Sequence, residues 1–96
     1  MILFEWDEAK NLSNQHKHSL DFEMAAQVFN DPFALTVQDR IENSEERCQT
    51  IGRVGATLVV LVAHTLNFDD KSEIVRIISA RKADRSERKR YEDQAY

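Results

Sequence analysis

The sequence predicts an α+β fold: an antiparallel sheet of about four to five strands with two N-terminal helices and a C-terminal helix. Apolar residues recur at helical spacing before Pro32, and strand-like patterns follow between Phe33 and Arg81: alternation with a period of two and one continuous β-branched run. Short polar segments between the expected strands favour an antiparallel meander with the helices collected on one sheet face. The other face is then open to an extended polymer or a partner chain.

An apolar run from Met1 to Trp6 predicts a short first strand, and Asp7 is placed to cap the helix that follows. The packed face of this helix is predicted from a stripe with helical spacing, formed by Ala9, Leu12, Ser13 and His16. His16 is therefore expected to be a packing histidine. A second stripe is polar and basic and consists of Lys10, Asn14 and Lys17.

A second helix is predicted after Ser19 and Asp21, which offer a break and a new N-cap. Its apolar face, between Phe22 and Phe29, is expected to pack on the core. The sequence Asn30-Asp31-Pro32 then ends the helix.

The middle of the chain predicts a hairpin. Its first strand starts at Phe33, residues 41–46 are polar enough for a loop, and its second strand runs from Arg47 to Val54. The segment from Gly52 to Gly55 predicts a turn into the next strand.

Two further strands and a helix complete the predicted order. The β-branched run from Leu58 to Val62 is typical of a central strand, and His64 to Lys71 forms a polar connection. The last strand runs from Glu73 to Arg81. Asp84 then caps a charged helix that continues through Tyr91.

The composition fits a single compact domain over residues 1–96, with 42% hydrophobic and 31% charged residues. Cys48 has no second cysteine for a disulfide, and no Cys/His spacing resembles a zinc site. We therefore expect a cytoplasmic protein without metal or cofactor. The longest apolar run, Ala56 to Ala63, is too short for a bilayer, and the start is not that of a signal peptide, so no membrane is expected.

The net charge of −4 is unevenly distributed. Residues 1–70 carry five Lys and Arg against twelve Asp and Glu, a balance of −7, while residues 71–96 carry eight against five, a balance of +3. A local basic surface can bind phosphates even in an acidic protein when a groove concentrates its charge.

Arg76 and Arg81 lie in the apolar last strand, where a guanidinium needs an anionic partner. Alternation places Val75 and Ile77 on the helix-packed face and Arg76 on the open face. Two partners are open for Arg76: a carboxylate, Glu45 or Glu46 across the sheet, or a phosphate in a groove.

Other candidates have a structural interpretation beside a functional one. Arg47 follows Glu45 and Glu46, which alone suggests a solvated charge cluster. His18 ends a helix and His64 ends the predicted central strand, and both can transfer protons or serve structure alone. The basic residues Lys82, Arg85 and Arg88 form either a solvated helix or a rim that guides RNA.

In this order the motifs resemble one family nearly end to end. They are Phe4-Glu-Trp-Asp7, Lys10, Asn14, Lys17-His18, Phe22, Phe29-Asn-Asp-Pro32, Glu46-Arg47, Ile51-Gly52, Arg76-Ile-Ile-Ser-Ala-Arg-Lys-Ala83, Glu87 and Tyr91. The chain resembles the BrnT toxins of bacterial type II toxin–antitoxin systems, whose fold is similar to that of RelE-like ribonucleases. Ser19 stands where the family pattern has a glycine.

The resemblance implies a metal-independent endoribonuclease that inhibits translation and growth. In such cleavage the 2'-hydroxyl of the RNA attacks the adjacent phosphate, so the protein supplies a base, an acid and cationic stabilisation. The expected phosphate contacts are Arg47, Arg76 and Arg81. The candidates for proton transfer and substrate orientation are Lys17, His18, Glu46 and His64, and those for RNA binding are Lys10, Lys82, Arg85 and Arg88.

The resemblance also implies partners. A BrnA-like antitoxin is expected to neutralise the toxin, and an antitoxin that dimerises would join two toxin chains in a heterotetramer that contacts operator DNA through the antitoxin. The alternative is a degenerate, non-catalytic toxin that binds its antitoxin or a regulatory complex through the open sheet face.

Overall fold

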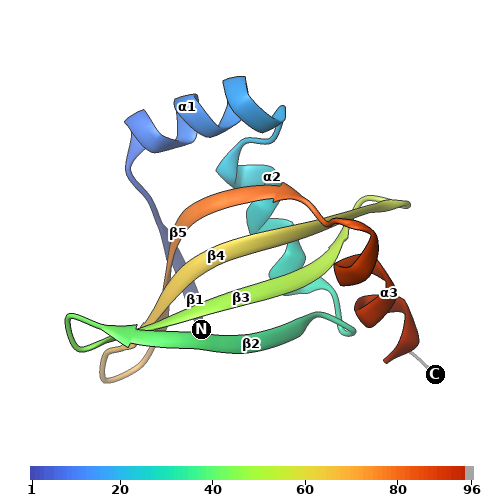
Figure 1. Ribbon diagram of the computed structural model, residues 1–96. Coiled ribbons are helices and arrows are strands. Elements are labelled where there is room, and N and C mark those ends of the chain that lie inside the picture. The colour runs from blue at the N-terminus through green and yellow to red at the C-terminus, as the bar shows by residue number, and fades with distance from the viewer. Residues whose placement is uncertain (95–96) are drawn as a thin grey trace.

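The computed structural model describes residues 1–94 and has a five-stranded mixed sheet with helices on both faces (Figure 1). Its elements are β1 (Ile2–Glu5), α1 (Glu8–His18), α2 (Phe22–Ala26), η1 (Gln27–Asn30), β2 (Leu35–Glu42), β3 (Glu45–Val54), β4 (Leu58–Phe68), β5 (Glu73–Lys82) and α3 (Arg85–Asp93). The last two residues of the expected domain lie outside the described part. The predicted α+β class is confirmed.

The sheet order is β1-β5-β4-β3-β2, and the four later strands form the expected antiparallel meander. The expectation of a purely antiparallel sheet is wrong, because β1 pairs with β5 in parallel. The two strands come from opposite ends of the chain, so no short hairpin forces them to run in opposite directions.

Helix α1 begins as predicted but packs through a different face. The Asp7 carboxylate accepts a hydrogen bond from the Lys10 N–H at 3.1 Å. The buried residues of the helix are Asn11 and Asn14, whereas His16 is exposed, so its predicted packing role is wrong. Hydrogen bonds to the main chain fix this face: the Asn11 Oδ1 accepts from the Phe22 N–H at 2.8 Å.

Asn14 attaches α1 to the edge of the sheet. Strand β1 pairs with β5 at Glu73–Arg76, and within residues 1–94 no strand continues along the rest of this edge. There the Asn14 amide accepts from the Ala80 N–H at 3.1 Å and donates to the Ala80 carbonyl at 2.9 Å. One side chain thus replaces the hydrogen bonds of a neighbouring strand.

The core lies between the sheet and the segment of α2 and η1. Phe22, Ala25 and Val28 are fully buried, and they pack against inward-facing residues of β4 and β5, namely Val60, Val62, Val75 and Ile77. The predicted end of the helical segment is confirmed, since η1 ends at Asn30.

Gly52 lies inside β3, so the turn predicted to start there is wrong. A Cβ on Gly52 would lie 2.7 Å from the Val28 Cγ1, which explains the glycine as a close approach between strand and helical segment. The turn is formed further on, where Gly55 has a φ of 66°.

Two connections are shorter than predicted. The β2–β3 turn consists of Asn43 and Ser44, with φ of 53° and 63°, instead of residues 41–46. Strand β4 continues to Phe68, so the predicted connection from His64 to Lys71 is wrong. Two of its polar residues find partners there: His64 lies 2.8 Å from the Thr50 hydroxyl, and the Asn67 amide donates to Glu45 at 2.8 Å.

Helix α3 lies on the sheet face opposite α2, which corrects the expectation that all helices share one face (Figure 1). Tyr91 packs there against Ile51, Val59 and Leu61. The predicted cap is confirmed, because the Asp84 carboxylate accepts from the Glu87 N–H at 2.8 Å. No helix within residues 1–94 is long and apolar enough to cross a membrane.

Candidate functional site

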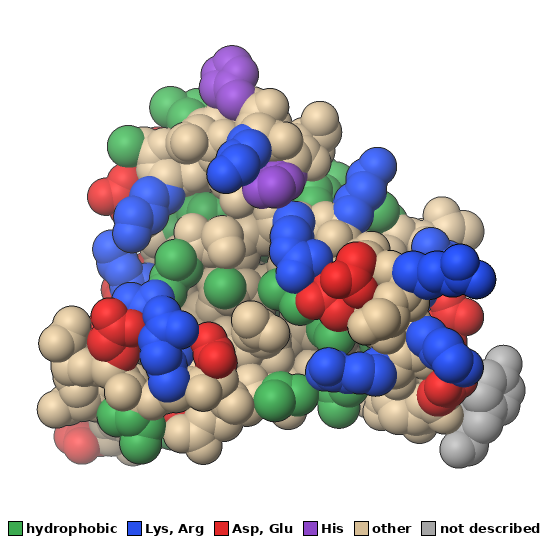
Figure 2. All heavy atoms as spheres, viewed as in Figure 1, with side chains coloured by type: hydrophobic (Ala, Val, Ile, Leu, Met, Phe, Trp, Pro, Cys, Tyr) green, Lys and Arg blue, Asp and Glu red, His purple; other side chains and the backbone are tan. Residues whose placement is uncertain are grey.

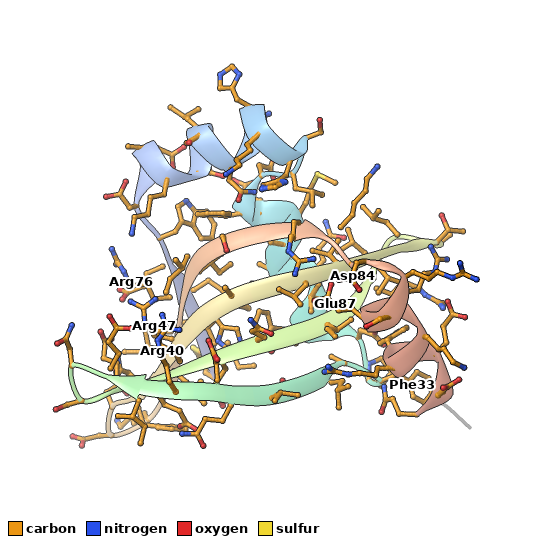
Figure 3. The ribbon with its side chains drawn as sticks, viewed as in Figure 1. Phe33, Arg40, Arg47, Arg76, Asp84 and Glu87 are labelled. Carbon is orange, nitrogen blue, oxygen red and sulfur yellow. The ribbon has the colours of Figure 1, made fainter. Side chains whose placement is uncertain are left out.

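A row of polar side chains crosses the whole sheet on the face that carries α3. The register places Arg40 of β2 opposite Arg47 of β3, Arg47 opposite Thr65 of β4, Thr65 opposite Arg76 of β5, and Arg76 opposite Glu5 of β1. Residues opposite one another in a sheet share a face. Figure 3 shows Arg40, Arg47 and Arg76 together at one end of the sheet. We call these five residues the arginine row.

Each arginine of the row lies beside a carboxylate. The Arg76 Nη1 lies 3.7 Å from the Glu5 Oε1, and the Arg47 Nε lies 3.4 Å from the Glu42 Oε2. The Arg40 Nε donates to the same Glu42 oxygen at 2.9 Å. This hydrogen bond, with the charges of Arg47 and Arg40, holds the pKa of Glu42 below its usual value.

The carboxylate partners differ from those expected. Glu45 accepts a hydrogen bond from the Asn67 amide at 2.8 Å. Glu46 is next to Arg47 in β3 and therefore points to the other face, opposite Leu66. Of the two alternatives for Arg76, the carboxylate one is met by a different residue, since Arg76 lies beside Glu5 and not beside Glu45 or Glu46.

A β-bulge brings Arg81 to the same face as Arg76. The two residues are five positions apart, so a regular strand would point them to opposite faces. The register shifts between Ala63 and His64, which leaves Ile78 without a partner in β4. Arg81 consequently lies opposite Leu61, on the face of α3.

Arg81 contacts α3 directly. Its guanidinium donates to the two oxygens of Glu87 at 2.7 and 2.9 Å. The hydrogen bond from Arg81 is the main reason why the pKa of Glu87 is lowered, and the same bond raises the pKa of Arg81. Arg81 therefore belongs to a second charged group, separated along β5 from the arginine row.

Figure 2 shows the same division over the visible surface. Lys and Arg side chains gather at both sides of this face, each group mixed with acidic side chains, and the area between them is mostly uncharged. Arg88 is paired with Glu92 at 2.9 Å, while Lys82 and Arg85 are exposed near the start of α3. An extended chain could therefore lie between the two charged groups.

Lys17 and His18 lie at the end of α1 beside β5. They line a pocket of about 210 Å³ together with Lys10, Ser13, Asn14, Ile78 and Ser79. Ile78 and Ser79 are between Arg76 and Arg81 in β5, so the pocket opens beside the stretch that joins the two charged groups.

His64 is on the opposite side of the sheet. It is 2% exposed, its Nδ1 lies 3.2 Å from the Thr65 carbonyl oxygen, and its ring meets the edge of Phe29 at 5.0 Å. Burial lowers its pKa, which favours the neutral ring. The structure therefore groups Arg47 and Arg76 with one another, and leaves His64 and Glu46 behind the sheet.

The comparisons with known proteins agree on one family. A family model described as the ribonuclease toxin, BrnT, of type II toxin–antitoxin systems matches residues 6–87. The chain belongs to this family. The 1.1 Å crystal structure of the Brucella abortus ribonuclease toxin BrnT has the same fold, with a TM-score of 0.66, 24% sequence identity, and coverage of 88% of this chain and 99% of that one. Among proteins of curated function, none matches.

The BrnT match includes Lys17, His18, Arg47, Arg76 and Arg81. Sequence reasoning missed Arg40, Thr65, Glu5 and Glu42, which complete the arginine row and its ion pairs. The signal for Arg40 was the short β2–β3 hairpin, whose two-residue turn sets the pairing of Arg40 with Arg47. As a toxin of a toxin–antitoxin system, a BrnT protein has an antitoxin partner.

Proposed function

We propose that this BrnT toxin is an endoribonuclease that cleaves RNA through attack of its 2'-hydroxyl on the adjacent phosphate, without a metal ion. The observation that carries the proposal is the common sheet face of Arg47, Arg76 and Arg81, which an extended RNA chain can cross. Such a reaction develops negative charge on the phosphate, and guanidinium groups stabilise it.

The proposed roles follow from position. Arg47 and Arg76 contact the reacting phosphate, and Arg81 contacts a neighbouring one after leaving Glu87. Lys17 and His18 border the pocket beside β5, and we propose them for proton transfer and substrate orientation. Glu46 and His64 point away from this face, so we assign them structural roles.

The proposed RNA path continues over a basic rim formed by Lys10, Lys82, Arg85 and Arg88. These residues are exposed and lie near either the pocket or the start of α3. Because phosphate contacts release counterions, we expect RNA binding to weaken as salt rises. The net charge of −4 makes this local rim more important than the charge of the whole chain.

We further propose a BrnA-like antitoxin as the partner, in a complex of two toxins and two antitoxins whose antitoxin contacts operator DNA. A dimeric antitoxin with one toxin on each subunit gives this stoichiometry. Light scattering on the co-expressed complex tests it, and a one-to-one heterodimer would contradict it. The proposed relationship extends to the RelE-like ribonucleases.

The function is tested by growth and by cleavage. Induced expression should stop growth, and Arg76→Gln should relieve the arrest while the purified variant keeps its thermal transition. Wild-type protein should cut single-stranded RNA in excess EDTA and leave 2',3'-cyclic phosphate ends. Lys89→Gln is the matched control, because it removes one exposed positive charge of α3 that pairs with Asp93 and is not among the proposed RNA contacts. Unimpeded growth with soluble wild-type protein would overturn the proposal.

A second candidate is a non-catalytic toxin that acts as an antitoxin-binding or autoregulatory module. The observation that favours it is the pairing of Arg40, Arg47, Arg76 and Arg81 with carboxylates of the same chain. In that case the purified protein would bind its antitoxin and leave RNA intact. The cleavage assay on antitoxin-free protein separates the two candidates.

A further inference from the structure

The centre of the arginine row contains two buried polar atoms without a hydrogen-bond partner in the described part of the chain, although one of them, the Arg47 Nε, lies 3.4 Å from the Glu42 carboxylate. Within residues 1–94, two buried side-chain nitrogen or oxygen atoms have no hydrogen-bond partner, the Arg47 Nε and the Thr65 Oγ1. Arg47 and Thr65 are directly opposite one another in β3 and β4. Both unpaired groups are therefore in one place on the sheet.

Thr65 is the stronger indication of a ligand. The residue is 2% exposed, and most buried hydroxyl groups in native proteins have a partner. A threonine on a sheet face usually bonds across strands, as Thr50 does with Thr36 at 2.8 Å. Thr65 instead has an arginine on each side, Arg47 and Arg76. Its hydroxyl can donate to an acceptor that approaches between them.

The acceptor that fits this environment is an oxyanion, such as a carboxylate or a phosphate group. Arg47 and Arg76 flank the hydroxyl, Arg40 lies one strand beyond Arg47, and guanidinium groups match phosphate oxygens in pairs. Neighbouring strands are about 4.8 Å apart, so the row from Arg40 to Arg76 is about 14 Å long. This length exceeds one phosphate group and suits consecutive phosphates of a nucleic acid backbone.

The carboxylates that pair with the arginines of the row, Glu5 and Glu42, are exposed to solvent, so a competing anion can reach them. Glu5 and Glu42 have side chains that are 53% and 43% exposed. The distances from Glu5 to Arg76 and from Glu42 to Arg47, 3.7 and 3.4 Å, exceed those of direct charged hydrogen bonds, while Glu42 also accepts a direct bond from the Arg40 Nε at 2.9 Å. Exposed pairs of this kind contribute little to stability.

We propose that Arg40, Thr65, Arg47 and Arg76 form a binding site for consecutive backbone phosphates of the RNA, with Glu5 and Glu42 occupying the arginines until phosphate replaces them. The Thr65 Oγ1 and the Arg47 Nε donate to one phosphate, and Arg40 binds the next. This inference rests on the proposed function for the choice of RNA, and it adds Arg40 and Thr65 as binding residues and Glu42 as a competitor.

Binding is measured apart from cleavage with a fluorescent 2'-O-methyl RNA of about 12 nucleotides, which lacks the attacking hydroxyl. Anisotropy titrations between about 50 and 200 mM salt give the affinity and its salt slope. Arg40→Gln should weaken binding and reduce the slope by about 0.7, the loss of one phosphate contact. Glu42→Gln should tighten binding severalfold, because it removes the competing carboxylate.

Thr65→Val separates a binding role from a structural one. The substitution preserves shape and removes an unpaired buried hydroxyl, so the variant should be at least as stable as the wild type. If the hydroxyl binds phosphate, affinity for the RNA should nevertheless fall about fivefold to tenfold. Lys89→Gln is again the control for loss of a single charge.

The outcomes distinguish this inference from the proposed function. Unchanged RNA affinity in both Arg40→Gln and Thr65→Val would overturn the site, even if wild-type protein cleaves RNA. Weakened binding in both variants, with no cleavage of unmodified RNA, would support the site and contradict the ribonuclease proposal. Failure of the wild-type protein to bind the RNA would overturn the site.

Discussion

The Arg81 guanidinium and the Glu87 carboxylate form a two-bonded ion pair that joins β5 to the first turn of α3. The same carboxylate accepts from the Asp84 N–H at 2.9 Å, as part of the capping box of the helix. Glu87 therefore takes part both in the cap of α3 and in the attachment of the helix to β5. Its side chain is 15% exposed, which sets it apart from the other acidic partners on this face.

Glu87→Gln should lower the free energy of unfolding by about 1 to 3 kcal/mol, because Arg81 loses its charged acceptor. Urea denaturation measures the change. Glu92→Gln on the same helix is the matched control, since its pair with Arg88 is exposed, and it should cost less than about 0.5 kcal/mol. Equal costs for the two variants would contradict the role of Glu87.

The same pair predicts a dependence on acid. The Arg81 hydrogen bond lowers the pKa of Glu87 in the folded protein, so the stabilisation is complete above the ordinary value of 4.5. It should be lost as the pH falls through the lower folded-state pKa. The slope of unfolding free energy against pH below 4.5 should be smaller in Glu87→Gln than in the wild type.

His64 predicts a second loss of stability on acidification, which begins at a higher pH than the loss due to Glu87. Burial lowers its pKa from 6.5, so the folded state holds the ring neutral and the unfolded state takes up the proton first. Stability should fall as the pH drops below 6.5, and His64→Gln should remove this loss. In His16→Gln the loss should persist, because His64 remains. A wild-type stability curve that is flat through this range would contradict the argument.

Replacing Asn14 by alanine is predicted to destabilise the protein strongly. The Asn14 amide pairs with Ala80 and also donates to the Leu20 carbonyl at 2.9 Å, at a position that is 7% exposed. Asn14→Ala should lower the free energy of unfolding by about 2 to 4 kcal/mol, because the main-chain groups of Ala80 lose their partners. Gln15→Ala, on the exposed side of α1, should change it by no more than about 0.5 kcal/mol.

Replacing Ser19 by glycine is predicted to stabilise the protein. Ser19 ends α1 with a φ of 59°, a left-handed conformation that glycine adopts without steric cost. Ser19→Gly should raise the unfolding free energy by about 0.5 to 1 kcal/mol. The same change at Ser13, inside the helix, should lower it by about 0.5 kcal/mol. A loss in Ser19→Gly would show that its hydroxyl has a role of its own.

The features that could be predicted from the sequence were local ones. Asp7 and Asp84 cap helices through bonds to residues three positions ahead, so a short window of sequence contains the whole signal. Alternation around Val75 and Ile77 also placed Arg76 on the correct face, because no irregularity intervenes between these residues.

The features that were missed depend on distant pairing. The partner of Arg76 is Glu5, from the other end of the chain, and only the parallel pairing of β1 with β5 brings them together. The side chosen by α3 depends on an apolar patch of β3 and β4 that receives Tyr91. Neither contact has a signal in the few residues around either partner. Local patterns such as alternation and helix capping therefore could not predict it.

The bulge at Ile78 has a consequence for sequence variation. The direction of Arg81 depends on how many residues separate it from Arg76, and the side chain at 78 matters less than the presence of a residue there. A substitution at this position would be tolerated if it suits the local pocket. A deletion would instead rotate the end of the strand by half a turn and direct Arg81 away from Glu87. Chain length between the two arginines is therefore under stricter constraint than chemical identity.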